Sequence, residues 1–216
     1  MQPRLLARAA IAVGATTMIA LLVLSVYRPV NAAAVLTAGK ADLKSAGALA
    51  FGPDGVLFVG DSIGGAIVAL DTNDKTPVKT AAINIQGLDQ KIAGLVGVMP
   101  DQILINDVIV NPISKNVYVS AARGRGPDAA PLVVKVEPSG KVTPLSLENI
   151  PHASVALVDA PADNPTARQN PRTTTITDME FINGNLLVTG MSNEEDQKST
   201  RLNSSHVSES RMPSSA

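Results

Sequence analysis

Residues 48–72 read ALAFGPDGVLFVGDSIGGAIVALDT, and this stretch decides the fold class of the chain. Short runs of apolar and β-branched residues alternate with glycine, proline and aspartate, which is typical of β-strands joined by tight turns. Pro53-Asp54-Gly55 predicts a hairpin turn, because proline presets φ, aspartate bonds locally and glycine accepts a positive φ. Gly64-Gly65 predicts the next turn, and residues 78–85 have the composition of a fourth strand.

The same pattern recurs twice further along the chain. A second copy starts with NDVIVNPISKNVYVSAA at residues 106–122, and continues with predicted strands over residues 132–136 and 142–147. A third copy begins with TDMEFINGNLLVTGM at residues 177–191, where Asn183-Gly184 is a strong hairpin signal. Four strands per copy is the pattern of propeller blades. We therefore predict an all-β fold, a β-propeller fragment of about two blades plus the start of a third.

Two insertions lengthen the repeat. The first, GLDQKIAGLVGVMPDQ at residues 87–102, predicts a short amphipathic helix that packs on the blades, with one apolar face formed by Leu88, Ile92, Leu95, Val96 and Met99. The second, residues 149–174, contains four prolines, so we expect no regular structure there. A loop of that length is either functional or decorative.

The first copy resembles an NHL repeat, whose pattern runs Pro-Asp-Gly, apolar strand, Asp-Ser, short turn and strand. The matching segments are Gly52-Pro53-Asp54-Gly55, Val59-Gly60-Asp61-Ser62 and Ile67-Val68-Ala69-Leu70-Asp71, although the usual basic residue after the turn is missing. More broadly the chain is similar to NHL and SMP-30/gluconolactonase-like propellers. This resemblance covers about half of residues 33–195 and is specific for fold rather than for activity.

The N-terminus, MQPRLLARAAIAVGATTMIALLVLSVYRPVNAAAV, has the pattern of a secretory signal. Arg4 and Arg8 precede the apolar residues 9–27, and Val30-Asn31-Ala32 places small residues at a cleavage site. We predict a signal peptide over residues 1–32 and a periplasmic or extracellular protein. The alternative is an uncleaved membrane anchor, because residues 9–27 are just long enough to span a bilayer.

The C-terminal tail, KSTRLNSSHVSESRMPSSA at residues 198–216, differs from everything before it. Residues 198–206 and 210–216 back-translate into two strings that resemble consecutive parts of a common sequencing adapter. We interpret residues 196–216 as a translated, disordered artefact and residues 33–195 as a truncated propeller domain. The alternative is a serine-rich disordered tail.

Charge and composition exclude some functions. Residues 33–195 contain 12 basic and 17 acidic residues, a net charge of −5, and the chain is only 2% aromatic. Such a domain lacks the basic footprint and the stacking platforms of a nucleic-acid binder. The chain has no cysteine, and His152 is its only histidine outside the tail, so a disulfide framework or a histidine-rich metal cluster is not expected.

The segment VLFVGDSIGG also looks like the first block of GDSL-type serine hydrolases, with Ser62 as the nucleophile. A nucleophilic serine needs a base that a third group orients. In that family the serine follows a strand and begins a helix, whereas here glycines and another strand follow. We therefore expect Asp61 and Ser62 to close a β-turn by hydrogen bonds from side chain to backbone.

Polar residues stand at the start of the first strand of the second and third copies. The resemblance to SMP-30-like lactonases, which use asparagine and acidic residues at such positions to hold a divalent cation, implies Asn106, Asp107 and Asp178 as metal ligands, with Ca²⁺ as the cation. The first copy offers only Gly47 at this position. The alternative is that these residues cap strands and join neighbouring blades by hydrogen bonds.

A basic loop, ARGRGPDAAP, joins two strands of the second copy, and its Arg123 and Arg125 are candidates to bind a carboxylate or phosphate. The alternative is a solvated loop.

We predict an exported binding module for a small molecule or a protein, contacted at the channel mouth and the inserted loops. A metal-dependent hydrolase or lactonase and a structural envelope protein are the alternatives, so the sequence does not decide whether the protein is an enzyme. We expect no nucleic-acid partner, no membrane contact beyond the N-terminal signal, and a monomer at full length.

Overall fold

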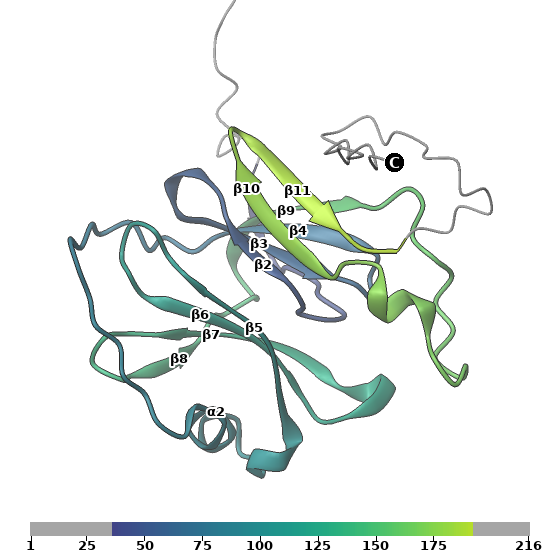
Figure 1. The fold of residues 1–216 in the computed structure, drawn as a ribbon, viewed down its shortest axis with the longest axis horizontal. Helices are drawn as coiled ribbons and strands as arrows, with labels where there is room; N and C mark the ends of the chain where they lie inside the picture. The colour runs from purple at the N-terminus through teal and green to yellow at the C-terminus, as the bar shows by residue number, and fades with distance from the viewer. Residues whose placement is uncertain (1–35, 192–216) are drawn as a thin grey trace, which may run out of the picture. The chain divides into compact units, whose positions relative to one another are not determined.

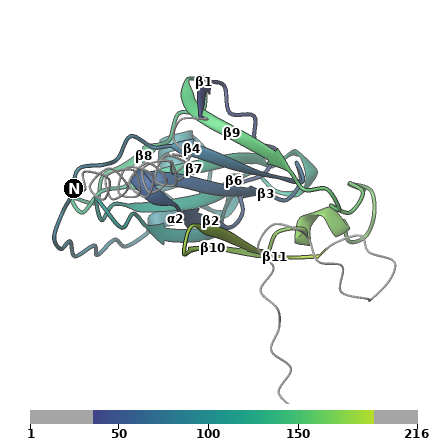
Figure 2. The ribbon, with the colours of Figure 1, turned by 90° about the horizontal axis from the view of Figure 1, so that it is seen from above.

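The computed structural model describes residues 36–191, which form antiparallel sheets and one α-helix (Figure 1). The first sheet has the strand order β1-β9-β4-β3-β2 (Figure 2). Its strands are β1 (Thr37–Gly39), β2 (Leu49–Phe51), β3 (Val56–Asp61), β4 (Ala66–Asp71) and β9 (Ile150–Ala156). The all-β class predicted from the strand and turn pattern is therefore confirmed.

A second sheet has the order β5-β6-β7-β8, and a separate hairpin pairs β10 with β11. The strands are β5 (Ile103–Val110), β6 (Val117–Arg123), β7 (Ala130–Val136), β8 (Val142–Pro144), β10 (Asp178–Ile182) and β11 (Asn185–Thr189). The hairpin turn was correctly predicted: Asn183 and Gly184 both have positive φ, 52° and 82°, as a two-residue turn of type I′ requires.

The prediction of a fourth strand over residues 78–85 is wrong, and so is the prediction that residues 149–174 contain no regular structure. Residues 78–85 form no strand, whereas β9 pairs antiparallel with β4, with Ala66 opposite Ala156 and Leu70 opposite His152. Residues 76–80 are exposed, so their apolar members have no sheet face to cover. The strand that pairs with β4 is instead β9, about eighty residues further along the chain. Whether a segment forms a strand depends more on an available sheet edge than on its own β-propensity.

The predicted helix is α2 (Leu88–Val96), and it covers one face of the second sheet. Ile92 and Ala93 are buried against that sheet. The helix ends at Gly97, which has φ 71°. Met99 therefore lies beyond the helix and is 66% exposed, and Leu95 is 40% exposed, so the inclusion of these two residues in the packed apolar face was wrong.

Three apolar clusters hold the layers together. The main cluster lies between the two sheets and includes the edge-to-face pair of Phe51 and Tyr118, whose ring centroids are 5.2 Å apart. A second cluster joins the second sheet to α2, and a third joins the first sheet to the β10–β11 hairpin. In the third cluster Phe58 stacks on Phe181 at 5.9 Å.

The hairpin packs on the first sheet, and the edge strand β2 contacts both β10 and the strand β5 of the second sheet. The chain leaves the first sheet after β4, builds the second sheet, returns as β9 and then continues into β10. The sheets of the described residues do not close on themselves. None of the helices within residues 36–191 is long and apolar enough to cross a membrane, and the predicted signal lies outside these residues.

Candidate functional site

Two of the predicted metal ligands join the sheets by hydrogen bonds to the backbone beside β2. The Nδ2 of Asn106 donates to the carbonyl of Ala46 at 2.7 Å. Asp107 accepts the amide of Leu49 on Oδ2 at 2.8 Å and the amide of Val108 on Oδ1 at 2.7 Å. Both side chains therefore do what the alternative to metal binding predicts, because they satisfy backbone groups at the unpaired edge of β2.

A β-bulge makes this arrangement possible. The register between β5 and β6 shifts between Ile105 and Asp107, which inserts Asn106 as an extra residue. Ser120, opposite Asp107, donates its Oγ to the carbonyl of Gly47 at 2.6 Å. Gly47, which occupies the corresponding strand-start position in the first copy, therefore accepts a hydrogen bond through its carbonyl.

Asp178 lies on β10 and is exposed, and its Oδ1 accepts the amide of Met179 at 2.8 Å. No side-chain hydrogen bond joins Asp178 to Asn106 or Asp107 on β5. Within residues 36–191, no three histidine, aspartate or glutamate side chains gather in a way that could hold a metal ion. Calcium binding by Asn106, Asp107 and Asp178 stays a prediction.

The two arginines of the basic loop lie at the end of β6 and just beyond it. The guanidinium of Arg125 donates from Nε and Nη2 to the carbonyl of Asp101 at 3.1 and 2.9 Å. Arg123 is the last residue of β6 and is exposed. One of the two predicted anion-binding side chains therefore fastens the loop to the 3-10 turn Pro100–Gln102, and anion binding by Arg123 and Arg125 stays a prediction.

The turn after β3 is built by a buried carboxylate. Asp61 is 2% exposed and accepts four hydrogen bonds, all of 2.8 Å. The donors are the amides of Lys44, Ser45 and Gly64 and the hydroxyl of Ser45. The bond from Gly64 closes the turn, which confirms the prediction for Asp61.

Ser62 is 7% exposed, and its hydroxyl bonds to the start of the third copy. Its Oγ donates to the carbonyl of Ile176 at 3.1 Å and accepts the amide of the same residue at 3.3 Å. Ser62 is therefore buried and committed to the backbone, and it does not have the exposed position that a nucleophile needs.

Asp74 is the centre of a polar cluster that the sequence did not predict. Its Oδ2 accepts hydrogen bonds from the hydroxyl of Ser114 at 2.7 Å, the amide of Asn116 at 2.9 Å and the hydroxyl of Tyr118 at 3.0 Å. Burial by itself raises the pKa of Asp74, but the three hydrogen bonds and the charge of Lys135 outweigh it and hold the pKa below its ordinary value. The cluster fixes the turn between β5 and β6.

Two shallow grooves, of about 330 and 380 Å³, lie on either side of the turn that contains Ser139. The smaller borders the Asp74 cluster, and the larger borders α2 at Lys91. The polar lining residues are Asp74, Asn84, Gln86, Lys91, Ser114, Asn116, Glu137 and Ser139, and the apolar ones are Ile85 in the larger groove and Val78 and Pro138 in the smaller.

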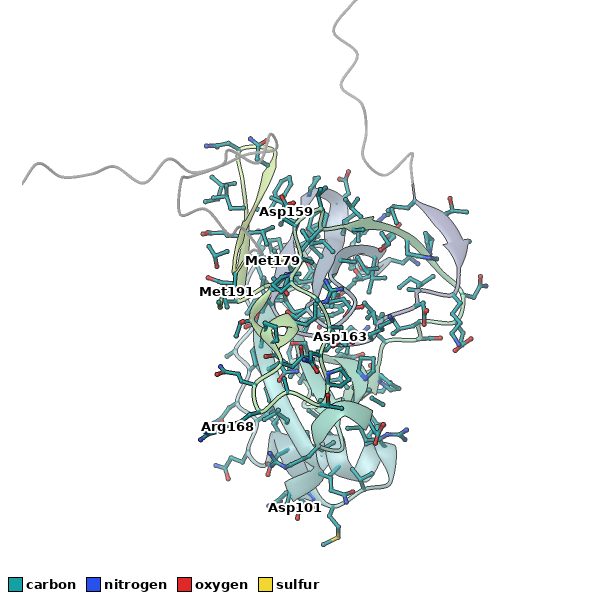
Figure 3. The ribbon with its side chains drawn as sticks, turned by 90° about the vertical axis from the view of Figure 1, so that its right-hand side faces the viewer. Asp101, Asp159, Asp163, Arg168, Met179 and Met191 are labelled. Atoms are coloured by element: carbon teal, nitrogen blue, oxygen red, sulfur yellow. The ribbon has the colours of Figure 1, made fainter. Side chains whose placement is uncertain are left out.

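The loop over residues 157–175 leads from β9 towards β10, includes the 3-10 turn Pro171–Thr174, and is organised around Asn170. The Oδ1 of Asn170 accepts the amides of Asn164 and Arg172, each at 3.1 Å. Its Nδ2 donates to Asp163 at 2.7 Å, and its carbonyl accepts the hydroxyl of Thr173 at 2.7 Å. Asp163 lies along this loop on the side that Figure 3 faces.

Both ends of this loop are tied to the β3–β4 turn. The amide of Leu157 donates to the carbonyl of Gly65 at 2.8 Å, and Ile176 at the far end holds Ser62. Residues 157–175 therefore form an ordered loop on a rigid support. The length and proline content of this segment are evident from the sequence, whereas its internal hydrogen bonds are not.

The structure places the predicted site residues in three separate locations: Asn106 and Asp107 beside β2, Asp178 on the hairpin, and Arg123 with Arg125 at the end of β6. It also presents the ordered loop over residues 157–175. Comparisons with protein-family models, with curated proteins and with solved structures found no match to this chain.

Proposed function

We propose that this protein is an exported binding module and that its ligand, a small molecule or a protein, contacts the loop over residues 157–175. The observation that carries the proposal is the internal order of this loop. Asn170 alone joins four other residues of the loop, and these hydrogen bonds restrict the conformations of the loop before a ligand binds. A preformed loop loses less conformational entropy on binding than a mobile one does.

The support beneath the loop favours the same function. Binding residues in proteins are concentrated on loops that a rigid scaffold positions. Here the scaffold is the β3–β4 turn, which the buried carboxylate of Asp61 fixes, and the hydroxyl of Ser62 connects that turn to Ile176. Residues 157–170, before the 3-10 turn, reach the length of about 12–15 residues at which connections without secondary structure become uncommon in compact domains and are often functional.

The finer fold assignment belongs to the same proposal: the sheets are blades of an NHL or SMP-30-like propeller. Three features support it. The first sheet has consecutive antiparallel strands β2, β3 and β4 with β9 outside them, the inner strands β5 and β10 flank β2, and the loop over residues 157–175 leads from the outer strand β9 to the inner strand β10. Passage from an outer strand to the next inner strand is how one blade follows another.

A chemical-shift experiment tests the binding proposal. A panel of small polar molecules, containing amino acids, sugars and short carboxylic acids, is titrated into the ¹⁵N-labelled protein. We expect at least one compound to shift the amide resonances of residues 157–176 and to leave those around Ser139 unchanged. Replacement of residues 162–169 by a glycine-serine linker should remove the shifts and leave the melting temperature within a few degrees, since a mostly exposed loop adds little to the core.

Binding in the grooves beside Ser139 would contradict this proposal. If the panel shifts the amides that line those grooves, and the loop amides do not respond, the ligand site is at the end of the second sheet and the proposal is wrong.

A further inference from the structure

Arg172, in the loop over residues 157–175, carries a charge that nothing in the described part of the chain neutralises. Its side chain is half-buried, and its Nε is fully buried without a hydrogen-bond partner among residues 36–191. Three ion pairs join residues within that range, and none of them includes Arg172. A desolvated guanidinium nitrogen that lacks an acceptor is costly, because its hydrogen bonds to water have been lost without replacement.

The guanidinium lies against the backbone of Gly65, in the β3–β4 turn. A Cβ added at residue 65 would overlap Nη1 and would force the end of the Arg172 side chain to move. Gly65 also has φ +63°, a conformation that favours glycine. The backbone of Arg172 is held in a 3-10 turn: its amide donates to Asn170, and its carbonyl accepts the amide of Thr175 at 3.2 Å. The charge is therefore oriented before any ligand arrives.

Asp163, an acidic residue of the same loop, makes its hydrogen bond with Asn170 and not with Arg172. Asp163 accepts the Nδ2 of Asn170 on Oδ1. Thr175, three residues after Arg172, is 5% exposed, and its hydroxyl also lacks a hydrogen-bond partner within the described residues. The base of the loop thus holds a cation and a hydroxyl whose hydrogen-bonding capacity the protein itself does not use.

We propose that Arg172 binds a carboxylate group of the ligand. The inference rests on the proposed function, for which it names the ligand chemistry. A guanidinium is planar and matches a carboxylate with two parallel hydrogen bonds. A carboxylate fits better than a phosphate, because one guanidinium balances one negative charge and residues 33–195 as a whole have a net charge of −5.

The buried Nε–H of Arg172 gives a direct readout. Burial slows its exchange with water, so it yields a resolved ¹H–¹⁵N resonance, which Arg172→Lys identifies by removing it. Sodium acetate and sodium succinate are titrated against sodium chloride at equal ionic strength, with inorganic phosphate as a separate arm. We expect the carboxylates to shift this resonance in a saturable manner and phosphate to shift it less.

Variants separate this contact from general charge. The acetate affinity of each variant is measured from the chemical-shift changes of the loop amides. Arg172→Lys should lower this affinity at least about tenfold, because the charge-assisted bidentate pair is lost. Gly65→Ala should weaken binding too, because its Cβ displaces Nη1. Arg168→Lys is the matched control: Arg168 is exposed on the same loop (Figure 3), and this change should leave the affinity unaltered.

The unmodified protein decides the matter even if a variant fails to fold. An Nε–H resonance that no carboxylate moves, or that phosphate moves more than acetate does, overturns the assignment. If neutral compounds of the panel still shift the loop amides in that case, the binding function stands and only the carboxylate assignment fails. An equal loss of affinity in Arg168→Lys would show nonspecific attraction and would also overturn it.

Discussion

Replacement of Asp61 should show whether the β3–β4 turn depends on the acceptor oxygens of this carboxylate or on its charge. Asp61→Asn keeps the shape and one oxygen, whereas Asp61→Ala removes every acceptor. Oδ1 accepts three of the four hydrogen bonds, and Oδ2 accepts the remaining one, from Lys44. An asparagine can place its oxygen at the Oδ1 position and so keep three bonds, with its amide opposed to the Lys44 N–H.

The magnitude follows from the number of donors left without a partner. A buried donor that loses its acceptor costs about 1–3 kcal/mol, and partly buried donors recover some of this from water. Asp61→Asn leaves one such donor, so we expect about 1–2 kcal/mol of destabilisation. Asp61→Ala leaves four and should cost about 3–5 kcal/mol, at the upper end for single substitutions.

Urea denaturation followed by circular dichroism measures both changes, and an unaltered m-value shows that the unfolded reference is the same. Asp159→Asn, an exposed residue of the loop, is the matched control and should change the free energy of unfolding by less than about 0.5 kcal/mol. Equal losses in Asp61→Asn and Asp61→Ala would mean that the charge matters and the number of acceptors does not. That result would refute the reasoning.

Three further predictions address the other contacts. Tyr118→Phe removes one hydrogen bond to Asp74 and should cost about 1–2 kcal/mol at neutral pH. Because the lowered pKa of Asp74 gives stability that is present above the ordinary value of about 4 and is lost as pH falls through the folded-state value, acid urea titrations should show a shallower loss in this variant; an unchanged pH profile would contradict it. Asp107→Ala should lower the melting temperature equally with calcium and with chelator, since Asp107 holds the amide of Leu49; a calcium-induced rise that this variant abolishes would instead support the metal prediction. Phe181→Ala should cost about 1–3 kcal/mol and speed hydrogen exchange in β10 and β11, because it removes the ring stacked on Phe58; uniform exchange changes across both sheets would argue against a local effect.

The sequence by itself determined the local structure. The apolar runs around Gly64-Gly65 and Asn183-Gly184 became the hairpins β3–β4 and β10–β11, because turn chemistry depends on neighbouring residues only. The helix was predictable from its spacing of apolar residues, but Leu95 and Met99 lie outside its buried face. At Met99 the glycine that ends the helix outweighs the pattern.

Only the tertiary structure decided which segments meet. The partner of β4 is β9, and nothing in a proline-containing segment about eighty residues away marks it as a strand until an open sheet edge is beside it. Asp74 reads as an ordinary loop aspartate, and it becomes the centre of a cluster because Ser114, Asn116 and Tyr118 come to it from one hairpin. The position of Asn106 and Asp107 at a strand start is evident from the sequence. Their hydrogen bonds to the backbone of Ala46 and Leu49 depend on the β-bulge and on the neighbouring sheet. The unpaired state of Arg172 could not be predicted from the sequence, because it depends on where the fold places the aspartate and glutamate side chains. Each of these features depends on groups far apart in sequence, whose contacts form only when apolar burial brings the sheets together.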